Sequence, residues 1–473
     1  MKQYNMIING EACVTGQSFD VINPANGEPF ASCTTGTGAD VDRAVNAASE
    51  AFKSWSRLPH EERIRLLHEV AGLVEAHMPE LMELIVKETG KPLQGLDGVG
   101  AGMEVGGTAA WIHVNADLEL PVDVIQDNEE ARVEVHRKPL GVVGSITPWN
   151  WPLLIASWHL TPALRAGNTV VLKPSPFTPV ATARFVELAN TILPPGVLNL
   201  VMGGPDVGAA MTAHPGIAKF VFTGSTPTGK SIMRAASDHL ARVTLELSGN
   251  DAGIVLDDVD PKEIAPALVA ACFHNNGQTC AALKRLYVPE NIYEELGQEM
   301  AAITKKLVVG DGLSDGVDLG PVQNARQLDI VNDLAESARK EGGRFLCGGQ
   351  KIEGAGYFFE PTIVADLTNG CTLVDEEPFG PIVPIIKYSK IEDVIDMANN
   401  SPSGLGGSVW SKNIERAIEI GQQLETGSVW INTHGAIQPD APFGGVKQSG
   451  MGVEFGLYGL EEFTHIQTLK IVK

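Results

Sequence analysis

A series of short apolar runs, separated by stretches with helical spacing, constrains the fold of this chain more than any other feature. After Gly141 the runs are GVVGSI, NTVVLK, GVLNLV, KFVFTG and RVTLEL. Runs that are almost continuously apolar suit strands buried on both faces of a parallel sheet, with helices covering each face. A second series follows Gly249, with the runs AGIVLDD, KRLYVP and GSVWIN. The pattern predicts an α/β protein with two such domains, joined near residues 247–250.

Three segments outside these series have patterns of their own. Residues 40–90 carry apolar residues at spacings of three and four, which predicts helices. The segment PVDVIQDNEEARVEVHRK alternates with a period of two around Asp127-Asn128, which predicts an exposed hairpin. The C-terminal FTHIQTLKIVK also alternates. Because the last two segments would offer unpaired strand edges, we expect them to join subunits.

Length and charge exclude several classes of protein. A chain of 473 residues is too long for one hydrophobic core, which also favours more than one domain. A net charge of -23 argues against a nucleic-acid partner, since phosphates attract basic surfaces. No apolar run approaches the roughly 18 residues of a membrane span, and the first residues lack the apolar segment of a signal peptide. We therefore expect a cytoplasmic protein with no membrane partner.

The six cysteines narrow the chemistry. They are scattered and form no C-x-x-C pair, and none of the eleven histidines belongs to an H-E-x-x-H motif. Neither a disulfide framework nor a metal site is expected. Cys280, in HNNGQTCAALKR, is then either a packing residue or a nucleophile. The polar, glycine-containing NNGQT before it suits the rim of a pocket better than a core strand, which favours the nucleophile.

Two further polar residues stand out from their surroundings. Glu246, in VTLELSG, is an acid within a β-rich run at the predicted domain junction, where burial without a role would be costly. Its alternative role is that of a strand-end carboxylate that reaches solvent. Asn150, in GSITPWNWPLL, follows a predicted strand and is either a turn residue or a donor to a developing oxyanion.

The segment GSTPTGKS, from Gly224 to Ser231, fits the P-loop pattern after a predicted strand. Its glycines, the small hydroxyl of Ser225 and the following helix would present backbone N–H groups to a phosphate. A dinucleotide pyrophosphate would be bound as well as a triphosphate, and a turn that needs glycine for steric reasons is a third interpretation. An NTPase is therefore a competing functional class.

Seven motifs taken together indicate a family. They are TPWNWPLL, LKPS, FTGSTPTG, LELSGN, NNGQTC, EEPFGPI and PFGGVKQSGMGVEFG. In this order and spacing, from about Asn9 to the C-terminus, the chain resembles the NAD(P)-dependent aldehyde dehydrogenase superfamily. The resemblance makes an NTPase, or a non-enzymatic family member, a remote alternative.

The resemblance implies a fold and its domains. The fold is aldehyde dehydrogenase-like, with a Rossmann-type dinucleotide-binding domain, an α/β catalytic domain and a small β oligomerisation arm. The implied boundaries are 1–118 and 140–247 for the dinucleotide-binding domain, 248–447 for the catalytic domain, and 119–139 and 458–473 for the oligomerisation segments. A homodimer or homotetramer is expected.

The resemblance also implies a mechanism. Cys280 would attack the aldehyde as a thiolate, while the Asn150 side chain and the Cys280 N–H hold the oxyanion. Hydride would pass to the nicotinamide, and Glu246 would activate the water that hydrolyses the thioester. Because CoA-acylating relatives lack this carboxylate, Glu246 predicts a free carboxylic acid as the product.

The implied cofactor is NAD, with NADP as the alternative. Lys173 resembles the family's adenosine-ribose contact, and Glu377 resembles the carboxylate that binds the nicotinamide ribose. The alternative interpretations are that Lys173 is a solvated charge and that Phe379 is a core residue. The predicted cofactor-binding residues are Thr147, Pro148, Trp149, Lys173, Ser175, Pro176, Gly224, Ser225, Gly229, Leu247, Glu377 and Phe379. The chain departs from the family pattern at Pro176, where NAD-preferring relatives often have glutamate, and in LSGN and AALKR, which replace the common Leu-Gly-Gly-Lys and Gly-Ser-Arg segments.

The implied substrate is a small-molecule aldehyde. Trp151, Trp158 and Phe443 are the predicted substrate-binding residues. Relatives that use carboxylated semialdehydes often have arginine at the Trp158 position, so an uncharged aliphatic or aromatic aldehyde is predicted. An aminoaldehyde is an alternative, because tryptophan faces attract cations; a semialdehyde is another, and both tryptophans could instead be core residues.

Overall fold

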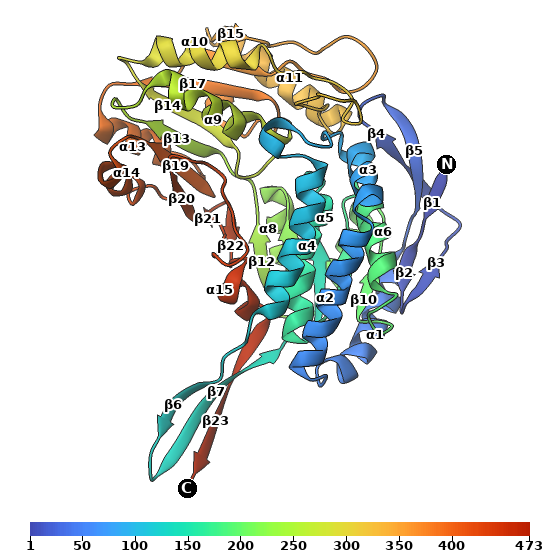
Figure 1. Cartoon of the computed structure of the whole chain (residues 1–473). Helices are drawn as coiled ribbons and strands as arrows, with labels where there is room; N and C mark the ends of the chain where they lie inside the picture. The colour runs from blue at the N-terminus through green and yellow to red at the C-terminus, as the bar shows by residue number, and fades with distance from the viewer.

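Two large sheets form the body of the protein (Figure 1). The structure is a computed structural model that describes all residues 1–473. The first sheet has eight strands, parallel at its centre and antiparallel at both edges. In spatial order they are β22 (Gly450–Met451), β12 (Arg242–Glu246), β11 (Lys219–Thr223), β8 (Val142–Ile146), β9 (Thr169–Lys173), β10 (Leu198–Leu200), β2 (Met6–Ile8) and β3 (Glu11–Cys13). All five apolar runs after Gly141 form strands of this sheet, as predicted.

The second sheet has seven strands and is parallel except for one edge. In spatial order they are β15 (Arg344–Cys347), β16 (Thr362–Leu367), β17 (Ile382–Tyr388), β14 (Leu283–Pro289), β13 (Asp251–Val255), β19 (Gly406–Trp410) and β20 (Ser428–Ile431). The three runs predicted after Gly249 form β13, β14 and β20. The chain passes from one sheet to the other between β12 and β13, at the predicted junction near residues 247–250.

Helices cover the two faces of each sheet, as expected for buried parallel strands (Figure 1). Those before residue 247 are α1 (Gly38–Trp55), α2 (His60–Ala76), α3 (Met78–Thr89), α4 (Ala101–Asp117), α5 (Pro152–Ala166), α6 (Val180–Ala189), α7 (Pro205–Thr212) and α8 (Thr226–Ser237), with the 3-10 segment η1 (Leu96–Gly98). Those after it are α9 (Pro261–Phe273), η2 (His274–Gly277), α10 (Tyr293–Thr304), α11 (Ala325–Lys340), α12 (Thr372–Asp375), α13 (Ile391–Asn399), α14 (Ile414–Gly421) and α15 (Gly456–Glu461). None of these helices has the length and apolarity needed to cross a membrane.

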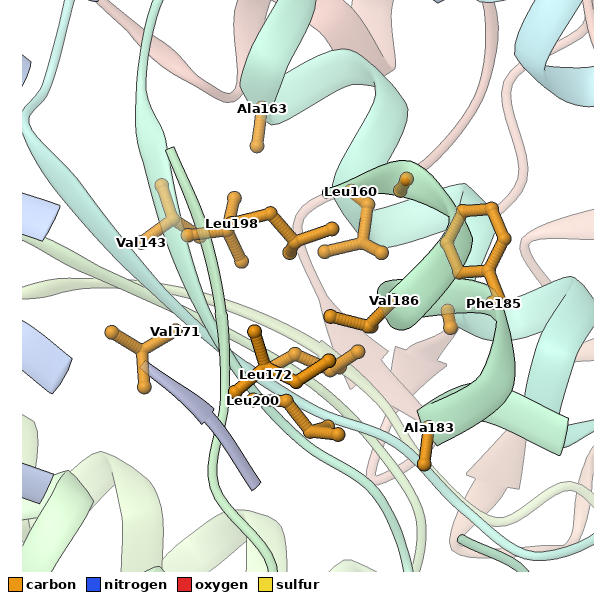
Figure 2. Packing of buried hydrophobic residues seen from close by; sticks show 14 of the residues in the cluster. Val143, Leu160, Ala163, Val171, Leu172, Ala183, Phe185, Val186, Leu198 and Leu200 are labelled. Carbon is orange, nitrogen blue, oxygen red and sulfur yellow. The ribbon is translucent and has the colours of Figure 1, made fainter. Parts of the chain in front are cut away.

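The core of the first region forms where α5 and α6 pack onto the central strands. Leu160 of α5 and Phe185 of α6 face Leu172 of β9 and Leu198 of β10 (Figure 2). All four side chains are buried, and a fully buried side chain of this size contributes roughly 1.5–3 kcal/mol to stability. This packing holds the carboxyl ends of β8, β9 and β11 in a fixed arrangement at one edge of the sheet.

The predicted hairpin is present as β6 (Asp123–Asp127) and β7 (Ala131–Pro139). The C-terminal strand β23 (Thr464–Val472) pairs antiparallel with β7 along its whole length. The three strands form an arm that projects from the body (Figure 1). Smaller sheets consist of β1 (Lys2–Tyr4), β5 (Glu28–Thr34) and β4 (Ser18–Asn23), and of β18 (Ser403–Gly404) and β21 (Val446–Lys447).

Candidate active site

Cys280 lies in the wall of a cavity of about 390 Å³. Helices α4 and α5 line one side of this cavity, and residues 267–281 and 432–443 line the other. The polar loop before Cys280 folds as η2, in which Asn275 and Asn276 have φ of 48° and 59°. Asparagine tolerates this left-handed conformation better than most residues. The loop therefore presents the thiol to the cavity, as the NNGQT motif predicts.

The cavity wall is mainly apolar and aromatic. Trp151, Trp158 and Phe443 all lie in it, together with Trp111 and Ile155. The two predicted tryptophans are buried, and they belong to the wall as well as to the packing around it. The ring of Trp158 packs 5.9 Å from Trp111, which further aromatic contacts hold in place.

Cationic side chains are absent from the cavity wall, which contains no lysine or arginine. His274 belongs to the wall, and its Nδ1 lies 3.0 Å from the Ala270 carbonyl. Burial lowers the pKa of His274 to about 4, so the ring is neutral at physiological pH. Asp97 is the charged residue of the wall, and it is exposed to solvent. The cavity therefore offers no lysine or arginine to a substrate carboxylate.

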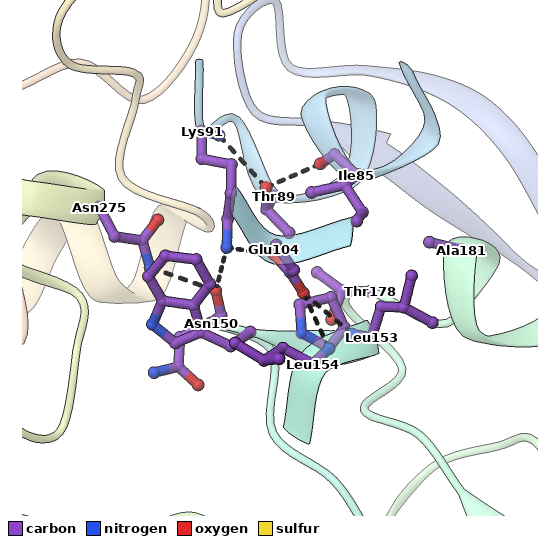
Figure 3. A network of polar contacts seen from close by, with 12 residues as sticks. Ile85, Thr89, Lys91, Glu104, Asn150, Leu153, Leu154, Thr178, Ala181 and Asn275 are labelled. Atoms are coloured by element: carbon purple, nitrogen blue, oxygen red, sulfur yellow. Dashed lines mark hydrogen bonds and ion pairs between the residues drawn. The ribbon is translucent and has the colours of Figure 1, made fainter. Parts of the chain in front are cut away.

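Asn150 is held by a buried polar network (Figure 3). The Lys91 ammonium donates to the Asn150 carbonyl at 2.8 Å, and the Asn275 amide donates to the same oxygen at 3.2 Å. Lys91 also forms an ion pair with Glu104, whose other oxygen accepts the Leu153 N–H at the start of α5. The Asn150 side-chain amide donates to the Gln278 carbonyl at 3.0 Å. The network thus joins Asn150 to the loop that carries Cys280.

Glu246 ends β12 and is buried, with only 4% of its surface exposed. Neither of its carboxylate oxygens has a hydrogen-bond partner. Burial raises the pKa of Glu246 well above its usual value, and the nearby carboxylate of Glu454 raises it further. An unpartnered buried carboxyl group is costly, and a reacting water is a group that could satisfy it.

Burial also dominates the chemistry of the Cys280 thiol, raising its pKa to about 12. Lys284 opposes this effect, whereas Glu377 and Glu246 add to it. A thiol in such surroundings is protonated at neutral pH, so forming the thiolate requires a base or a change in the surrounding charges.

The predicted cofactor residues gather at the carboxyl edge of the first sheet. Thr147, Pro148 and Trp149 follow β8; Lys173, Ser175 and Pro176 end or follow β9. Gly224 and Ser225 follow β11, and Ser225 is the N-cap residue of α8. Because ligands of parallel α/β sheets bind at this edge, the placement fits a dinucleotide.

The remaining four cofactor candidates lie beside this edge. Leu247 follows β12, and a Cβ at Gly229 would lie 2.5 Å from the Leu247 side chain, so a larger residue at Gly229 would displace that side chain. Phe379 packs edge-to-face with Trp149 at 5.1 Å. Glu377 forms an ion pair of 2.7 Å with Lys284.

Two unsatisfied polar groups support the fit of a dinucleotide. The buried Lys173 ammonium has one weak contact, 3.4 Å from the Pro174 carbonyl, and burial lowers its pKa to about 8. The buried Thr147 hydroxyl has no partner. Ribose hydroxyls or a phosphate would satisfy such groups.

The P-loop match does not form a phosphate cradle. Helix α8 begins at Thr226, so Gly229 and Lys230 lie within the helix and not at the end of a loop. The Lys230 ammonium donates to the Gln448 side chain at 2.8 Å, on the exposed surface. A triphosphate site needs the loop and the lysine to converge on the same phosphates, and here they do not.

The sequence interpretation missed four charged residues around the site: Lys91, Glu104, Lys284 and Glu454. Each is at least 95% buried. Glu104 and Lys284 lie in otherwise apolar stretches, and a charge in such a stretch was the one available signal.

Comparison with known proteins shows the family to which the chain is related. A model of the aldehyde dehydrogenase family matches residues 13–469. Phenylacetaldehyde dehydrogenase of Pseudomonas fluorescens is 40% identical over 99% of this chain and 96% of its own length. Human retinaldehyde dehydrogenase 3 is 40% identical over 97% of this chain and 90% of its own. An NAD+ complex of an aldehyde dehydrogenase from Bacillus cereus superposes with a TM-score of 0.96 and 35% identity, covering 99% of this chain and 96% of that one.

A dinucleotide-type sheet beside an apolar cavity that contains a thiol defines the class: this is a nicotinamide-dependent oxidoreductase. Within that class, the chain belongs to the aldehyde dehydrogenase family. It oxidises an aldehyde to the carboxylic acid with NAD(P)+ as the cofactor.

Proposed function

We propose that the protein oxidises an uncharged aliphatic or aromatic aldehyde, with Cys280 as nucleophile, Asn150 as oxyanion donor and Glu246 as the base for hydrolysis. The observation that carries this proposal is the apolar cavity that contains the thiol and has no lysine or arginine in its wall. An aldehyde with an apolar body would bury it there, whereas a carboxylate would lose its hydration without gaining a partner.

In the first half of the reaction, Glu246 also takes the proton of the Cys280 thiol, the resulting thiolate bonds to the carbonyl carbon, and the carbonyl oxygen becomes an oxyanion. The Asn150 amide, freed from the Gln278 carbonyl, and the Cys280 N–H are the proposed donors to that oxygen. A bound nicotinamide would accept the hydride that leaves the same carbon. Cys280 then carries the acyl group as a thioester.

In the second half, Glu246 takes a proton from water, which attacks the thioester carbon and releases the acid and the thiol. The burial that raises the pKa of Glu246 makes it a stronger base once it is ionised. For the cofactor, Lys173 and Pro176 would lie at the adenosine ribose, Ser225 at the pyrophosphate, and Glu377 at the nicotinamide ribose.

A panel of substrates tests the proposed substrate class. Benzaldehyde and hexanal should give higher kcat/KM values than succinic semialdehyde, because the cavity wall provides no cation for the second carboxylate. An aminoaldehyde is the second candidate, favoured by the acidic Asp97 in the wall. The Lys91 ammonium already lies 3.4 Å from the Trp151 ring, which disfavours a substrate cation at that ring. Preference for the semialdehyde would contradict the proposal.

Two substitutions test the proposed roles. Cys280→Ser should lower turnover by about three orders of magnitude or more while NAD binding persists, since the nucleophile lies on the covalent path.

Glu246→Gln should still transfer hydride but fail to release the acyl group, so rapid mixing should show a burst of NADH and little further turnover. Normal turnover in the first variant, or an unchanged steady-state rate in the second, would assign these roles to other residues.

The same proposal covers domains and assembly. Residues 1–118 and 140–247 would bind the dinucleotide, 248–447 would supply the thiol, and the arm at 119–139 and 458–473 would join subunits into a homodimer or homotetramer. The apolar residues exposed on the arm, among them Ile125 and Ile466, support the last assignment. We expect the enzyme in the cytoplasm.

A further inference from the structure

Lys284 is a buried lysine that lies beside the nucleophile and has no part in the mechanism above. It is on β14, four residues after Cys280, and only 3% of its side chain is exposed. Its ammonium donates to the Cys280 carbonyl and forms an ion pair of 2.7 Å with Glu377. A third, longer contact of 3.5 Å reaches the Gly249 carbonyl. These contacts can employ all three N–H groups of the ammonium, so the side chain is held in one position.

The Cys280 carbonyl is confined between Lys284 and Gly249. A Cβ at Gly249 would lie 2.5 Å from that carbonyl oxygen, closer than a side chain tolerates. The Lys284 ammonium contacts the same oxygen. Contact with both groups fixes the peptide that follows the nucleophile, and therefore restricts the directions in which the thiol can point.

Charge gives Lys284 a second influence on the thiol. Of the charged groups that act on Cys280, Glu377, Glu246 and Asp251 raise the pKa of the thiol, and Lys284 is the one that lowers it. In a buried environment such effects are weakly screened. The Lys284–Glu377 pair therefore joins the thiol to the carboxylate assigned above to the nicotinamide ribose.

We propose that Lys284 is a positioning residue that holds the Cys280 main chain. Through its ion pair with Glu377, Lys284 also makes the reactivity of the thiol depend on the segment that would bind the nicotinamide ribose. The proposal rests on the function proposed above for Cys280 and Glu377. It adds a role for a lysine in the AALKR segment, where the chain departs from the pattern common in the family.

Alkylation of Cys280 by iodoacetamide, measured against pH in the enzyme without dinucleotide, tests this role. Lys284→Met keeps most of the side-chain volume and removes the charge, so the pH midpoint for alkylation should rise by about one unit. At any pH below the midpoint, this shift appears as an about tenfold slower alkylation. Lys284→Arg should restore most of the reactivity. The modified Cys280 peptide is quantified by mass spectrometry, and the partly exposed Cys371 in the same sample serves as the internal reference.

Lys219→Met is the matched control, because Lys219 is also a buried lysine paired with a glutamate, and its charge is not among those acting on Cys280. Its alkylation midpoint should equal that of the unmodified enzyme. An unchanged midpoint in Lys284→Met, or an equal rise in Lys219→Met, would overturn the proposal.

If Lys284→Met does not fold, Glu377→Gln provides the second test. It leaves Lys284 without its counter-charge and should lower the midpoint, and an unchanged midpoint would again overturn the proposal. Cys280→Ser distinguishes a failure of this proposal from a failure of the proposed function. Normal activity in that variant would refute the proposed nucleophile, whereas the alkylation midpoints would still report on Lys284.

Discussion

At the level of single residues, two buried polar groups without partners belong to the proposed reacting centre. Both oxygens of Glu246 and the hydroxyl of Thr147 lack hydrogen bonds although they are buried. A folded protein rarely leaves such groups unpaired, because each costs about 1–3 kcal/mol. Water for Glu246 and a dinucleotide for Thr147 would satisfy them, which is the chemistry that the family requires.

Glu454 should control the pH at which Glu246 becomes an active base. Glu454→Gln removes the negative charge that raises the pKa of Glu246, so that pKa falls and the ionised base is present at lower pH. We expect the acidic limb of the kcat profile to move to lower pH. The control is Glu419→Gln at an exposed position, which changes the net charge by the same amount and should leave the acidic limb of the kcat profile in place. An acidic limb that does not move in Glu454→Gln would contradict the role of the Glu454 charge.

Pro176 should weaken discrimination between the cofactors. A glutamate there would bind the adenosine ribose and repel a 2′-phosphate, whereas proline has neither a carboxylate nor an N–H. We expect NAD to be preferred by less than about a hundredfold in kcat/KM, or ~2.8 kcal/mol. Pro176→Glu should sharpen the preference by weakening NADP use. Strict NAD specificity in the unmodified enzyme would show that another residue excludes the phosphate.

At the level of elements, the start of α5 depends on one side chain from α4 and one from the loop after α3. Glu104 of α4 accepts the Leu153 N–H at the first turn of α5, and Lys91 neutralises that carboxylate while it holds the Asn150 carbonyl. A carboxylate at a helix N-terminus satisfies its free N–H groups and interacts favourably with the helix dipole. The start of α5 and the loop residue Asn150 before it are therefore fixed by charges that lie far away in the sequence.

Lys91→Met should damage both stability and catalysis. It leaves the Glu104 carboxylate buried without a counter-charge, which costs about 3–5 kcal/mol of unfolding free energy. The Asn150 carbonyl also loses a donor, so kcat should fall. The control is Lys87→Met, which breaks the exposed pair with Glu83 on α3 and should cost less than about 0.5 kcal/mol. Urea unfolding and steady-state rates measure both effects, and equal stabilities of the two variants would contradict the role of the network.

For the whole molecule, we propose that the arm of β6, β7 and β23 determines how copies of the chain associate. The arm projects from the body as a three-stranded sheet (Figure 1). It exposes apolar side chains. An exposed apolar sheet of this kind favours pairing with another chain. The body itself needs no contribution from the arm to form its two sheets.

Substitution in the arm should change the assembly but not the fold. Light scattering should give a multiple of the 50.3 kDa chain mass for the unmodified protein. Ile466→Asp, in the middle of the exposed arm surface, should shift the population towards the single chain. Ile414→Asp, at an exposed position on α14, should not. A single-chain mass for the unmodified protein at micromolar concentration would rule out the expected dimer or tetramer.

The elements that the sequence predicts by itself are those with a strong local pattern. All eight apolar runs form strands, and the alternating segments form the arm. β15, β16, β17 and β19 were not among the predicted runs, although they complete the second sheet. Local alternation and continuous apolarity are properties of neighbouring residues, so they can be read without knowing the fold.

The placement of charge, by contrast, was decided by the tertiary structure alone. The sequence points to Cys280, Glu246 and Asn150 through their motifs, but nothing in the local sequence shows that Lys91 would contact Asn150 or that Lys284 would pair with Glu377. Each of these contacts joins segments that lie 59 or 93 residues apart, by the difference of their residue numbers. Whether a charge is solvated or buried, and which group it meets, depends on how distant segments pack around it.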